Sequence, residues 1–502
     1  MEATETTRLL AGESRASRDE EEAATQIPKE HPLEWESPSD PGNPKNWSRS
    51  RKWTCTMIVS FYCLIAPTAA SMVIPAMPSL ARDLNITSEA FLQLTMSLFV
   101  FGWTGGPLIL GPLSEVFGRA PILHIGNFGF ITFNLLCGFV RNQHAFVFLR
   151  FISGLCGSGP TSLGTGILSD LWASDERGTS LAIYTIMPLV GPTAGPLLAG
   201  YIVQYYNWPY IFFLCSLLAA IVLVPGVVIL PETFGPVILL RRRAERLKQK
   251  GISSPIPAAN HGKHNTTKKR IRKGLARPFI LLGTQPIIQV LALYFGFYFG
   301  LYQLFIAMYH AMWRDLYDMT PIQASANYLS ITMGLILGCE IAGPLNDKIY
   351  RYLRQRNNGI DLPEYRIWLM LPAAILVPGG LLWFGWSAVA QAHWIVPNLG
   401  MATACVGIVM TFMCMQAYVM DAYPVYAASA QGALTVVRSL TAFTMPVMAP
   451  AMIHQWGYGW SSTVLAIIAV VIGSLAPAFL HLKGASLRAK SPYAAGNVNL
   501  EG

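Results

Sequence analysis

Long apolar stretches, arriving one after another along the chain, limit what this protein can fold into. A helix needs about 20 mostly apolar residues to cross the hydrocarbon layer of a bilayer, and there its backbone polar groups must be satisfied within the helix. We therefore predict an all-α membrane protein with twelve transmembrane helices, at 54–75, 91–111, 121–140, 145–169, 179–202, 209–231, 284–308, 323–345, 366–386, 394–419, 429–453 and 460–481.

Composition excludes a soluble enzyme. Of the 502 residues, 53% are hydrophobic and 13% are charged, whereas soluble domains carry about 25% charged residues. The predicted cytosolic segments contain no Walker loop, zinc signature or Rossmann fingerprint, so we expect no cofactor, no metal and no enzymatic activity. Energy for any transport would come from an ion gradient.

Basic residues gather in one loop, and this gathering predicts the topology. Of the Lys and Arg residues, 13 lie between Arg241 and Arg277, after the sixth predicted span. Loops rich in Lys and Arg stay in the cytosol, so the positive charge indicates topology and not a nucleic-acid partner. We expect both termini to be cytosolic.

These features divide the chain into five parts. Residues 1–52 are polar and acidic and lack the apolar run of a secretory signal, so we predict a disordered cytosolic tail. A six-helix bundle at 53–231, a basic cytosolic linker at 232–278 and a second six-helix bundle at 279–482 follow. Residues 483–502 form a cytosolic C-terminal tail.

A short motif recurs at equivalent places in the two predicted bundles. After the second span the sequence reads Gly111-Pro-Leu-Ser-Glu115-Val-Phe-Gly118-Arg119, and after the eighth it reads Gly343-Pro-Leu-Asn-Asp347-Lys-Ile-Tyr-Arg351. Duplicated bundles around a central site are a common way to build alternating access. The repeat therefore favours a transporter over a receptor or a channel.

The first copy of this motif resembles the signature of the major facilitator superfamily, G-x-L-[AS]-[DE]-x-x-G-R. The fifth span contains Gly191-x-x-x-Gly195-Pro196-x-x-Ala199-Gly200, which looks like the superfamily's antiporter motif with one glycine replaced by Ala199. The segments NPKNW, LRFISG, PETFGPVILLRRRAERL and YVMDAYPVYAASA resemble the fungal twelve-span drug:proton antiporter branch. This resemblance implies a proton-coupled exporter of small amphiphilic compounds, such as drugs or fungal secondary metabolites.

Three charged residues fall well inside predicted spans, away from the span ends, where a charge costs at least about 2.5 kcal/mol at the bilayer centre. The resemblance implies a proton-coupling role for Arg150, and the alternative is a snorkelling anchor near the outer end of the span. Glu340 is a candidate proton carrier if burial raises the pKa of its carboxyl, or else a structural carboxylate. Arg438 would attract an anionic substrate, pair with a carboxylate or support a gate.

The repeated motif predicts an inner gate. We expect Glu115 to lie against the N-terminus of a helix and Arg119 to pair with Asp170, at the inner end of the fourth span. By symmetry we expect Arg351 to pair with Asp421. These ion pairs would hold the cytosolic side closed, and the gate residues are Gly111, Glu115, Gly118, Arg119, Asp170, Asp347, Arg351 and Asp421.

Small and aromatic residues suggest where the bundles pack and where a substrate binds. The antiporter-like motif, with Gly191, Gly195, Pro196 and Gly200, would let helices approach closely between the two halves. Aromatic and thioether side chains suit an amphiphilic ligand of variable shape. From spans seven and ten we select Tyr298, Tyr302, Met413 and Gln416 as candidate cavity residues.

Several expectations concern the cellular setting. Asn85-Ile-Thr87 is a glycosylation acceptor pattern in the first outer loop. The partners we expect are the lipid bilayer, a small-molecule substrate and protons, with the protein acting as a monomer in the plasma or the vacuolar membrane. A proton symporter for organic acids is an alternative that the cationic Arg150 and Arg438 support, and a non-transporting sensor on the same fold is a more distant one.

Overall fold

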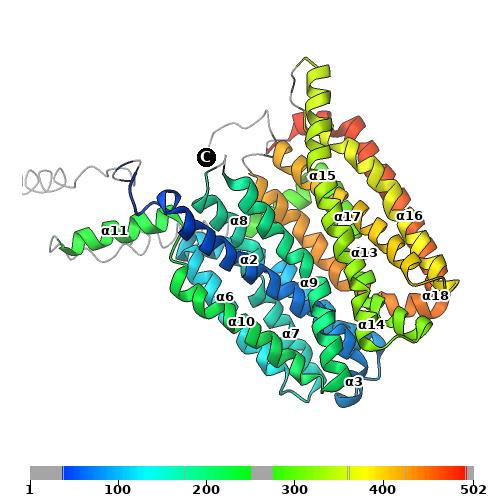
Figure 1. Cartoon of the computed structure of the whole chain (residues 1–502). Coiled ribbons are helices and arrows are strands. Elements are labelled where there is room, and N and C mark those ends of the chain that lie inside the picture. Colours follow the sequence, from blue (N-terminus) through cyan, green and yellow to red (C-terminus); the bar gives the residue numbers. More distant parts are fainter. Residues whose placement is uncertain are drawn as a thin grey trace, which may run out of the picture.

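Two bundles of helices lie side by side in the computed structural model (Figure 1). It describes residues 35–494 except 36, 38, 174–175, 250–274, 359, 361, 424–425 and 492. The predicted N-terminal tail up to residue 34, most of the basic linker and the end of the C-terminal tail therefore lie outside the described residues. The helices match the all-α fold that the apolar stretches predict.

The first bundle carries the N-terminal predicted spans. Its elements are η1 (Pro44–Asn46), α2 (Arg49–Met72), η2 (Ile74–Ala76), α3 (Met77–Asp83), α4 (Glu89–Gly105), α5 (Pro107–Phe117), α6 (Arg119–Cys137), α7 (Gln143–Gly157), α8 (Gly159–Leu171), α9 (Arg177–Tyr205) and α10 (Pro209–Ile229).

The second bundle follows helix α11 (Gly235–Gln249) and a short apolar helix, Leu275–Thr284. Its elements are α13 (Pro286–Tyr317), α14 (Pro321–Ala326), α15 (Tyr328–Arg356), η3 (Pro363–Leu369), α16 (Met370–Val389), α17 (Ile395–Ala422) and α18 (Ala427–Lys490).

Ten helices in the described part of the chain are long and apolar enough to cross a membrane. The stretch Ser429–Lys490 has 62 residues and covers the last two predicted spans. Gly457, at φ 69°, interrupts α18 within this stretch, so α18 consists of two helices joined at a kink. The fourth predicted span is divided between α7 and α8, each too short to be counted, with Pro160 at the start of α8. A proline lacks the backbone N–H that would continue the helix. The helices therefore accommodate twelve crossings.

The first long helix of each bundle is the most buried. In the most apolar 18 residues of Arg49–Asp83, 83% are buried, and the value for Pro286–Tyr317 is 78%, whereas no other candidate span in the described residues exceeds 61%. α2 packs mainly against α9, and α13 packs mainly against α18. The two bundles are thus built alike around α2 and α13.

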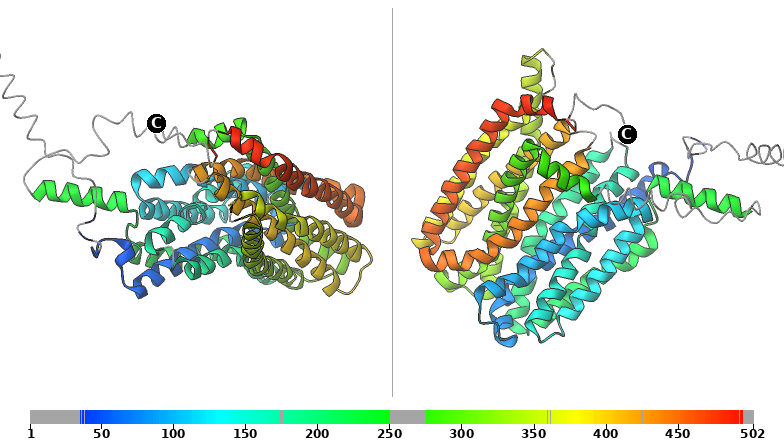
Figure 2. Two further views of the ribbon diagram at one scale, coloured as in Figure 1. Left: turned by 90° about the horizontal axis from the view of Figure 1, so that it is seen from above. Right: turned by 180° about the vertical axis from the view of Figure 1, so that it is seen from behind.

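The molecule has two distinguishable ends. α11 and the long tip of α15 lie at one end, and α3 and α14 lie at the other (Figures 1 and 2). Because α11 begins the basic linker, we call its end the inner end, following the positive-inside rule. The outer end is the one that carries α3 and α14.

Candidate functional site

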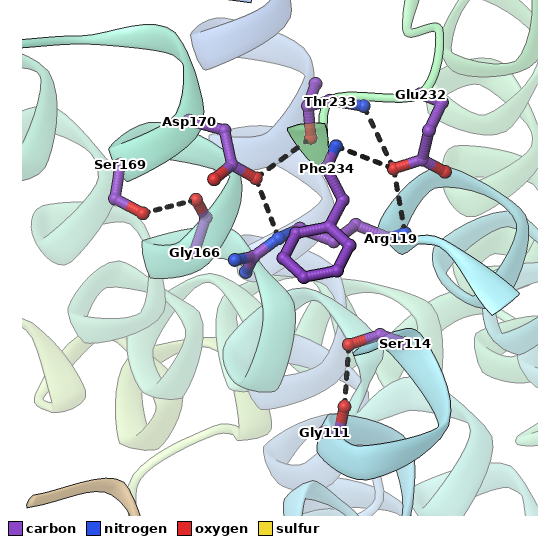
Figure 3. A network of polar contacts seen from close by, with 9 residues as sticks. All are labelled: Gly111, Ser114, Arg119, Gly166, Ser169, Asp170, Glu232, Thr233 and Phe234. Carbon is purple, nitrogen blue, oxygen red and sulfur yellow. Dashed lines mark hydrogen bonds and ion pairs between the residues drawn. The ribbon is translucent and has the colours of Figure 1, made fainter. Parts of the chain in front are cut away.

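The predicted pair of Arg119 and Asp170 is present at the inner end of the first bundle (Figure 3). Arg119 Nε lies 2.7 Å from Asp170 Oδ2, and both side chains are 18% exposed. Gly166 makes room for the guanidinium, because a methyl group in its place would overlap Arg119. Phe234 stacks on the other side, with its ring centre 5.1 Å from Arg119 Cζ.

The helix N-terminus beside this pair holds Glu232, and not Glu115 as the motif predicts. Glu232 Oε1 accepts hydrogen bonds from the backbone N–H groups of Arg119 (3.0 Å), Thr233 (3.0 Å) and Phe234 (2.8 Å). A carboxylate is favoured at the first residue of α6 by the partial positive charge of the helix end. Glu115 is exposed and has no polar partner among the described residues, so its predicted place was wrong.

The predicted pair of Arg351 and Asp421 is also wrong, because Arg366 takes the role of Arg351. Arg366 Nη1 lies 2.9 Å from Asp347 Oδ1, and its Nε lies 3.0 Å from Asp421 Oδ2. Arg351 is exposed and its Nε donates to the backbone carbonyl of Asp347 at 3.3 Å, one turn earlier in the same helix.

A single residue explains why the two motif copies differ. Gly118 ends α5 with φ 102° and ψ 155°, a conformation nearly confined to glycine, and this break lets Arg119 start a new helix. The second copy has Tyr350 at that position, and α15 continues unbroken to Arg356. Arg351 therefore stays on the helix surface, and Arg366 stacks over the Tyr350 ring at 4.3 Å.

Each ion-pair network joins elements within a single bundle, one network in each bundle. Arg119, Asp170 and Glu232 come from α6, α8 and the segment after α10, whereas Asp347, Arg366 and Asp421 come from α15, η3 and α17. In the described residues neither network bridges the two bundles. Any gating role would thus be indirect, through the position of helix ends within a bundle.

Arg150 lies on α7 with 0% of its surface exposed. Its Nε donates to the Thr95 carbonyl at 3.0 Å and its Nη2 donates to the Ala69 carbonyl at 3.2 Å. Its Cζ lies 4.2 Å from the centre of the Phe99 ring, and Nη1 has no hydrogen-bond partner among the described residues. Full burial excludes the snorkelling anchor and leaves a charged group held in the core of the first bundle.

The other two charged residues within predicted spans differ from Arg150. Arg438, on α18, lies over the rings of Phe295 and Phe299 at 5.5 and 5.1 Å, and its buried Nε lacks a hydrogen-bond partner in the described part of the chain. Glu340 is exposed on α15, on the same face as the exposed Leu337 and Ile341. The expectation of a buried carboxylate was therefore wrong for Glu340.

Glycines on α9 allow close contacts with two other helices. A methyl group on Gly191 would lie 2.5 Å from Pro67 Cβ, and one on Gly195 would lie 2.5 Å from the Thr68 carbonyl oxygen, both in α2. A methyl group on Gly200 would lie 2.6 Å from Ser325 Oγ in α14 of the other bundle. Pro196 is buried on the same helix.

Hydroxyl groups join α9 to the second bundle near these glycines. Thr193 Oγ1 donates to the Tyr328 carbonyl at 2.7 Å and also contacts Thr332 Oγ1. Thr332 Oγ1 in turn lies 3.2 Å from the Leu189 carbonyl. Thr193 and Tyr328 are buried, so this contact closes the outer half of the boundary between the bundles.

The candidate cavity residues separate into two groups. Tyr298 is fully buried and its hydroxyl donates to the Ala469 carbonyl of α18 at 3.0 Å, so it supports packing and its selection as a cavity residue was wrong. Tyr302 and Met413 are half-buried and Gln416 is exposed. These three remain candidates for contact with a substrate.

Asn85 lies in the short loop between α3 and α4 at the outer end, with φ 53° and an exposed side chain. The loop is accessible from the side that the charge distribution puts outside. Modification of Asn85 stays a prediction.

Comparison with known proteins decides the family. Residues 59–446 match the Major Facilitator Superfamily, which is most of both bundles. The chain belongs to the major facilitator superfamily.

Curated members of this superfamily resemble the chain over nearly its whole length. The MFS-type transporter oryF of Aspergillus oryzae is 45% identical over 490 residues, which is 98% of each chain. The efflux pump vrtL of Penicillium aethiopicum is 37% identical over 465 residues, 92% of each chain. Such relatives make this superfamily member a multi-pass membrane transporter of small molecules and not an enzyme.

Solved structures share its fold. The inward-open xylose transporter XylE of E. coli aligns with a TM-score of 0.62 and 15% identity over 86% of this chain and 95% of that one. This likeness concerns the fold alone.

Three side chains with polar contacts at the inner end of this transporter escaped the sequence reasoning. Glu232 is the acidic residue of the PETFGP segment, and its charge was the feature from which a contact with a helix N-terminus could have been predicted. Arg366 begins a span as an isolated cation, and only the three-dimensional fold reveals its two carboxylate partners. Arg488 binds both oxygens of Glu364, at 3.0 and 2.9 Å, near the inner end of α18.

Proposed function

We propose that this superfamily member exports a small amphiphilic organic compound, of the drug, toxin or fungal secondary-metabolite type, in exchange for protons. Two relatives with high coverage are named efflux pumps, vrtL and radE of Floropilus chiversii. The antiporter-like motif on α9 supports exchange over symport.

The observation that carries proton coupling is the burial of Arg150. A guanidinium with 0% exposure, whose Nη1 has no partner in the part of the chain that the structure describes, is expensive to keep within a membrane. The predicted spans of the first bundle contain no Asp or Glu to neutralise it. Such a charge is retained for function, and coupling of proton and substrate movement is the function that the resemblance implies.

Alternating access would use the boundary contacts between the bundles. The Thr193 and Thr332 contact and the close approach at Gly200 hold the outer half of this boundary together. The networks of Arg119 and Arg366 would keep the inner helix ends of each bundle in register while one bundle rocks against the other.

The test is efflux from a host that lacks its own exporters. Cells expressing the protein are loaded with labelled amphiphiles and organic acids, and efflux is followed with and without a proton uncoupler. We expect uncoupler-sensitive efflux that Arg150→Ala abolishes.

Arg82→Ala is the matched control, because Arg82 is an exposed arginine in the last turn of α3 at the outer end. Uncoupler-insensitive efflux would contradict proton coupling. If the protein reaches the cell surface but shows no efflux, and organic acids enter together with protons, the organic-acid symporter would be the correct hypothesis instead of the exporter.

For the cellular setting, the proposal is a monomer in the plasma membrane with both termini in the cytosol. A fluorescent fusion distinguishes the plasma membrane from the vacuolar membrane. If deglycosylation changes the electrophoretic mobility of the wild type but not of Asn85→Gln, the loop between α3 and α4 faces the secretory lumen and carries a glycan.

A further inference from the structure

Arg438 is a cation that the described part of the protein leaves without an anion. Its Cζ lies 5.5 Å and 5.1 Å from the ring centres of Phe295 and Phe299, and no hydrogen bond or ion pair to a described residue involves its guanidinium. Arg150, by comparison, donates to two backbone carbonyls. Ring faces attract a cation, but they do not replace the hydrogen bonds that the guanidinium loses on leaving water.

The helix that carries Arg438 lies where the two bundles meet. On the inner side of it along α18, a methyl group on Gly432 would lie 3.3 Å from Leu108 of the first bundle. On the outer side, the ring of Phe443 lies 5.7 Å from that of Phe101, also in the first bundle. These contacts show that α18 borders the first bundle. At 3.6 residues per turn, Gly432 and Phe443 share one face of α18, and the half-buried Arg438 lies on a different face, directed at Phe295 and Phe299 of α13.

The helices packed around Arg438 place their carboxylates only at their ends. α13 has Asp315 in its last turn at the outer end, and α4 has Glu89 in its first turn. α17 has Asp421 near its inner end, where Arg366 already binds it. The described part of these helices thus offers Arg438 no carboxylate within the membrane, so an anion that pairs with it would come from a bound molecule.

Aromatic rings surround the guanidinium on one side. Phe412 of α17 packs edge-on against Phe295 at 4.8 Å and lies 6.0 Å from Phe299. Tyr302 continues the group at 6.1 Å from Phe299. Phe412 and Tyr302 are half-buried, so part of each ring is left uncovered by the described residues.

From this arrangement we infer that Arg438, Phe295, Phe299, Phe412 and Tyr302 form an anion-plus-ring subsite, and that the exported compound is an organic acid that carries an aromatic ring and is recognised as its anion. Arg438 binds the carboxylate or phenolate, and the rings pack against the aromatic part. The inference rests on the proposed efflux function and specifies its substrate class.

The test is binding to purified, full-length protein in detergent, which does not depend on transport. The probes are 2-naphthoate and its neutral amide, 2-naphthamide, which share a ring system and differ in charge, together with cyclohexanecarboxylate, which keeps the charge without an aromatic ring. We expect wild-type protein to bind 2-naphthoate at least tenfold more tightly than either of the other two compounds.

Three variants separate charge from packing. Arg438→Gln removes the preference for naphthoate over naphthamide, Arg438→Lys keeps part of it, and Phe299→Leu lowers the preference for naphthoate over cyclohexanecarboxylate. Thermal unfolding of each variant in the same detergent checks that it is folded, and Arg438→Lys carries the test if Arg438→Gln does not fold.

Equal binding of naphthoate and naphthamide by the wild type, including failure to bind both, would overturn the subsite. So would an unchanged preference in Arg438→Gln. Efflux measured in parallel keeps the two proposals apart: the binding preference without any efflux refutes the exporter and keeps the subsite, whereas efflux of neutral and anionic probes alike refutes the subsite and keeps the exporter.

Discussion

Single residues decide how each copy of the repeated motif behaves. In the first copy Gly118 breaks the helix and frees Arg119 to reach Asp170, and in the second copy Tyr350 leaves the helix intact. A one-residue difference thus moves the cation of the second network from Arg351 to Arg366. Sequence symmetry predicts two networks, but it does not predict the residues that build the second one.

The Gly118 position gives a test with an internal control. Gly118→Ala would force φ 102° on a residue with a side chain, and its methyl group would collide with the Glu232 carboxylate. We expect the free energy of unfolding to fall by about 1–3 kcal/mol, seen as a lower thermal midpoint in detergent. Gly111→Ala, in the same motif, has nothing within 4 Å of the added methyl and should not lower it. Equal effects of the two changes would contradict the backbone explanation.

Arg366 and Arg351 form a second matched pair. Arg366→Ala leaves Asp347 and Asp421 without their cation, so we expect a loss of about 1–2 kcal/mol in unfolding free energy and slower efflux. Arg351→Ala removes an exposed side chain and should change stability by less than about 0.5 kcal/mol. Thermal unfolding and efflux of both variants check this, and a larger effect for Arg351→Ala would restore the symmetric pairing.

At the scale of elements, the apolar stretches of the sequence predict the helices, but they do not predict which side chains of neighbouring helices make contact. Prediction succeeded for Arg119 and Asp170, which a local motif and a span end bring together. It failed for Tyr298, because nothing in the seventh span reveals that its hydroxyl meets the Ala469 carbonyl on α18. Side-chain direction depends on how neighbouring helices rotate against one another, and that rotation is set by packing across the whole bundle.

An ion pair joins helix α11 to the N-terminal segment. Arg242 Nη1 lies 2.8 Å from Asp40 Oδ2, and its Cζ lies 5.8 Å from the Trp35 ring. The Gly42 backbone N–H, followed by Arg242, holds the pKa of Asp40 below its ordinary value of 3.8. A lowered pKa means that the contact is complete at neutral pH and weakens only as the pH falls through the lowered value.

We expect Arg242→Gln to loosen α11 at neutral pH. Cleavage after Glu245 by a glutamate-specific protease should become several-fold faster, because local opening exposes the helix backbone. Arg241→Gln changes the adjacent exposed arginine and should leave the rate unchanged. Equal rates for Arg242→Gln and wild type would mean that the ion pair does not hold α11.

At the scale of the whole molecule, contacts between the bundles set the balance between transport states. Thr193 and Thr332 link α9 to α15 in the outer half of the boundary. Thr193→Val removes these hydrogen bonds, and a loss of about 1 kcal/mol shifts a two-state equilibrium about fivefold. We therefore expect more of the outward-open state.

Spin labels on the exposed positions Thr87 and His393, one in each bundle at the outer end, would measure this shift. The population with the longer distance should rise in Thr193→Val. Thr185→Val is the control, since among the described residues the Thr185 hydroxyl bonds only to the Leu181 carbonyl of its own helix, at 2.8 Å. An unchanged distance distribution in Thr193→Val would show that the closure of the boundary depends on other contacts.

The unbroken α15 has a mechanical consequence. Its 29 residues span roughly 43 Å at 1.5 Å per residue, whereas the hydrocarbon layer is about 30 Å thick. The surplus extends past the inner membrane surface as a rigid arm anchored in the second bundle. When that bundle tilts, the tip of the arm moves farther than any point within the bilayer. Each transport cycle therefore moves the cytosolic tip of α15 back and forth.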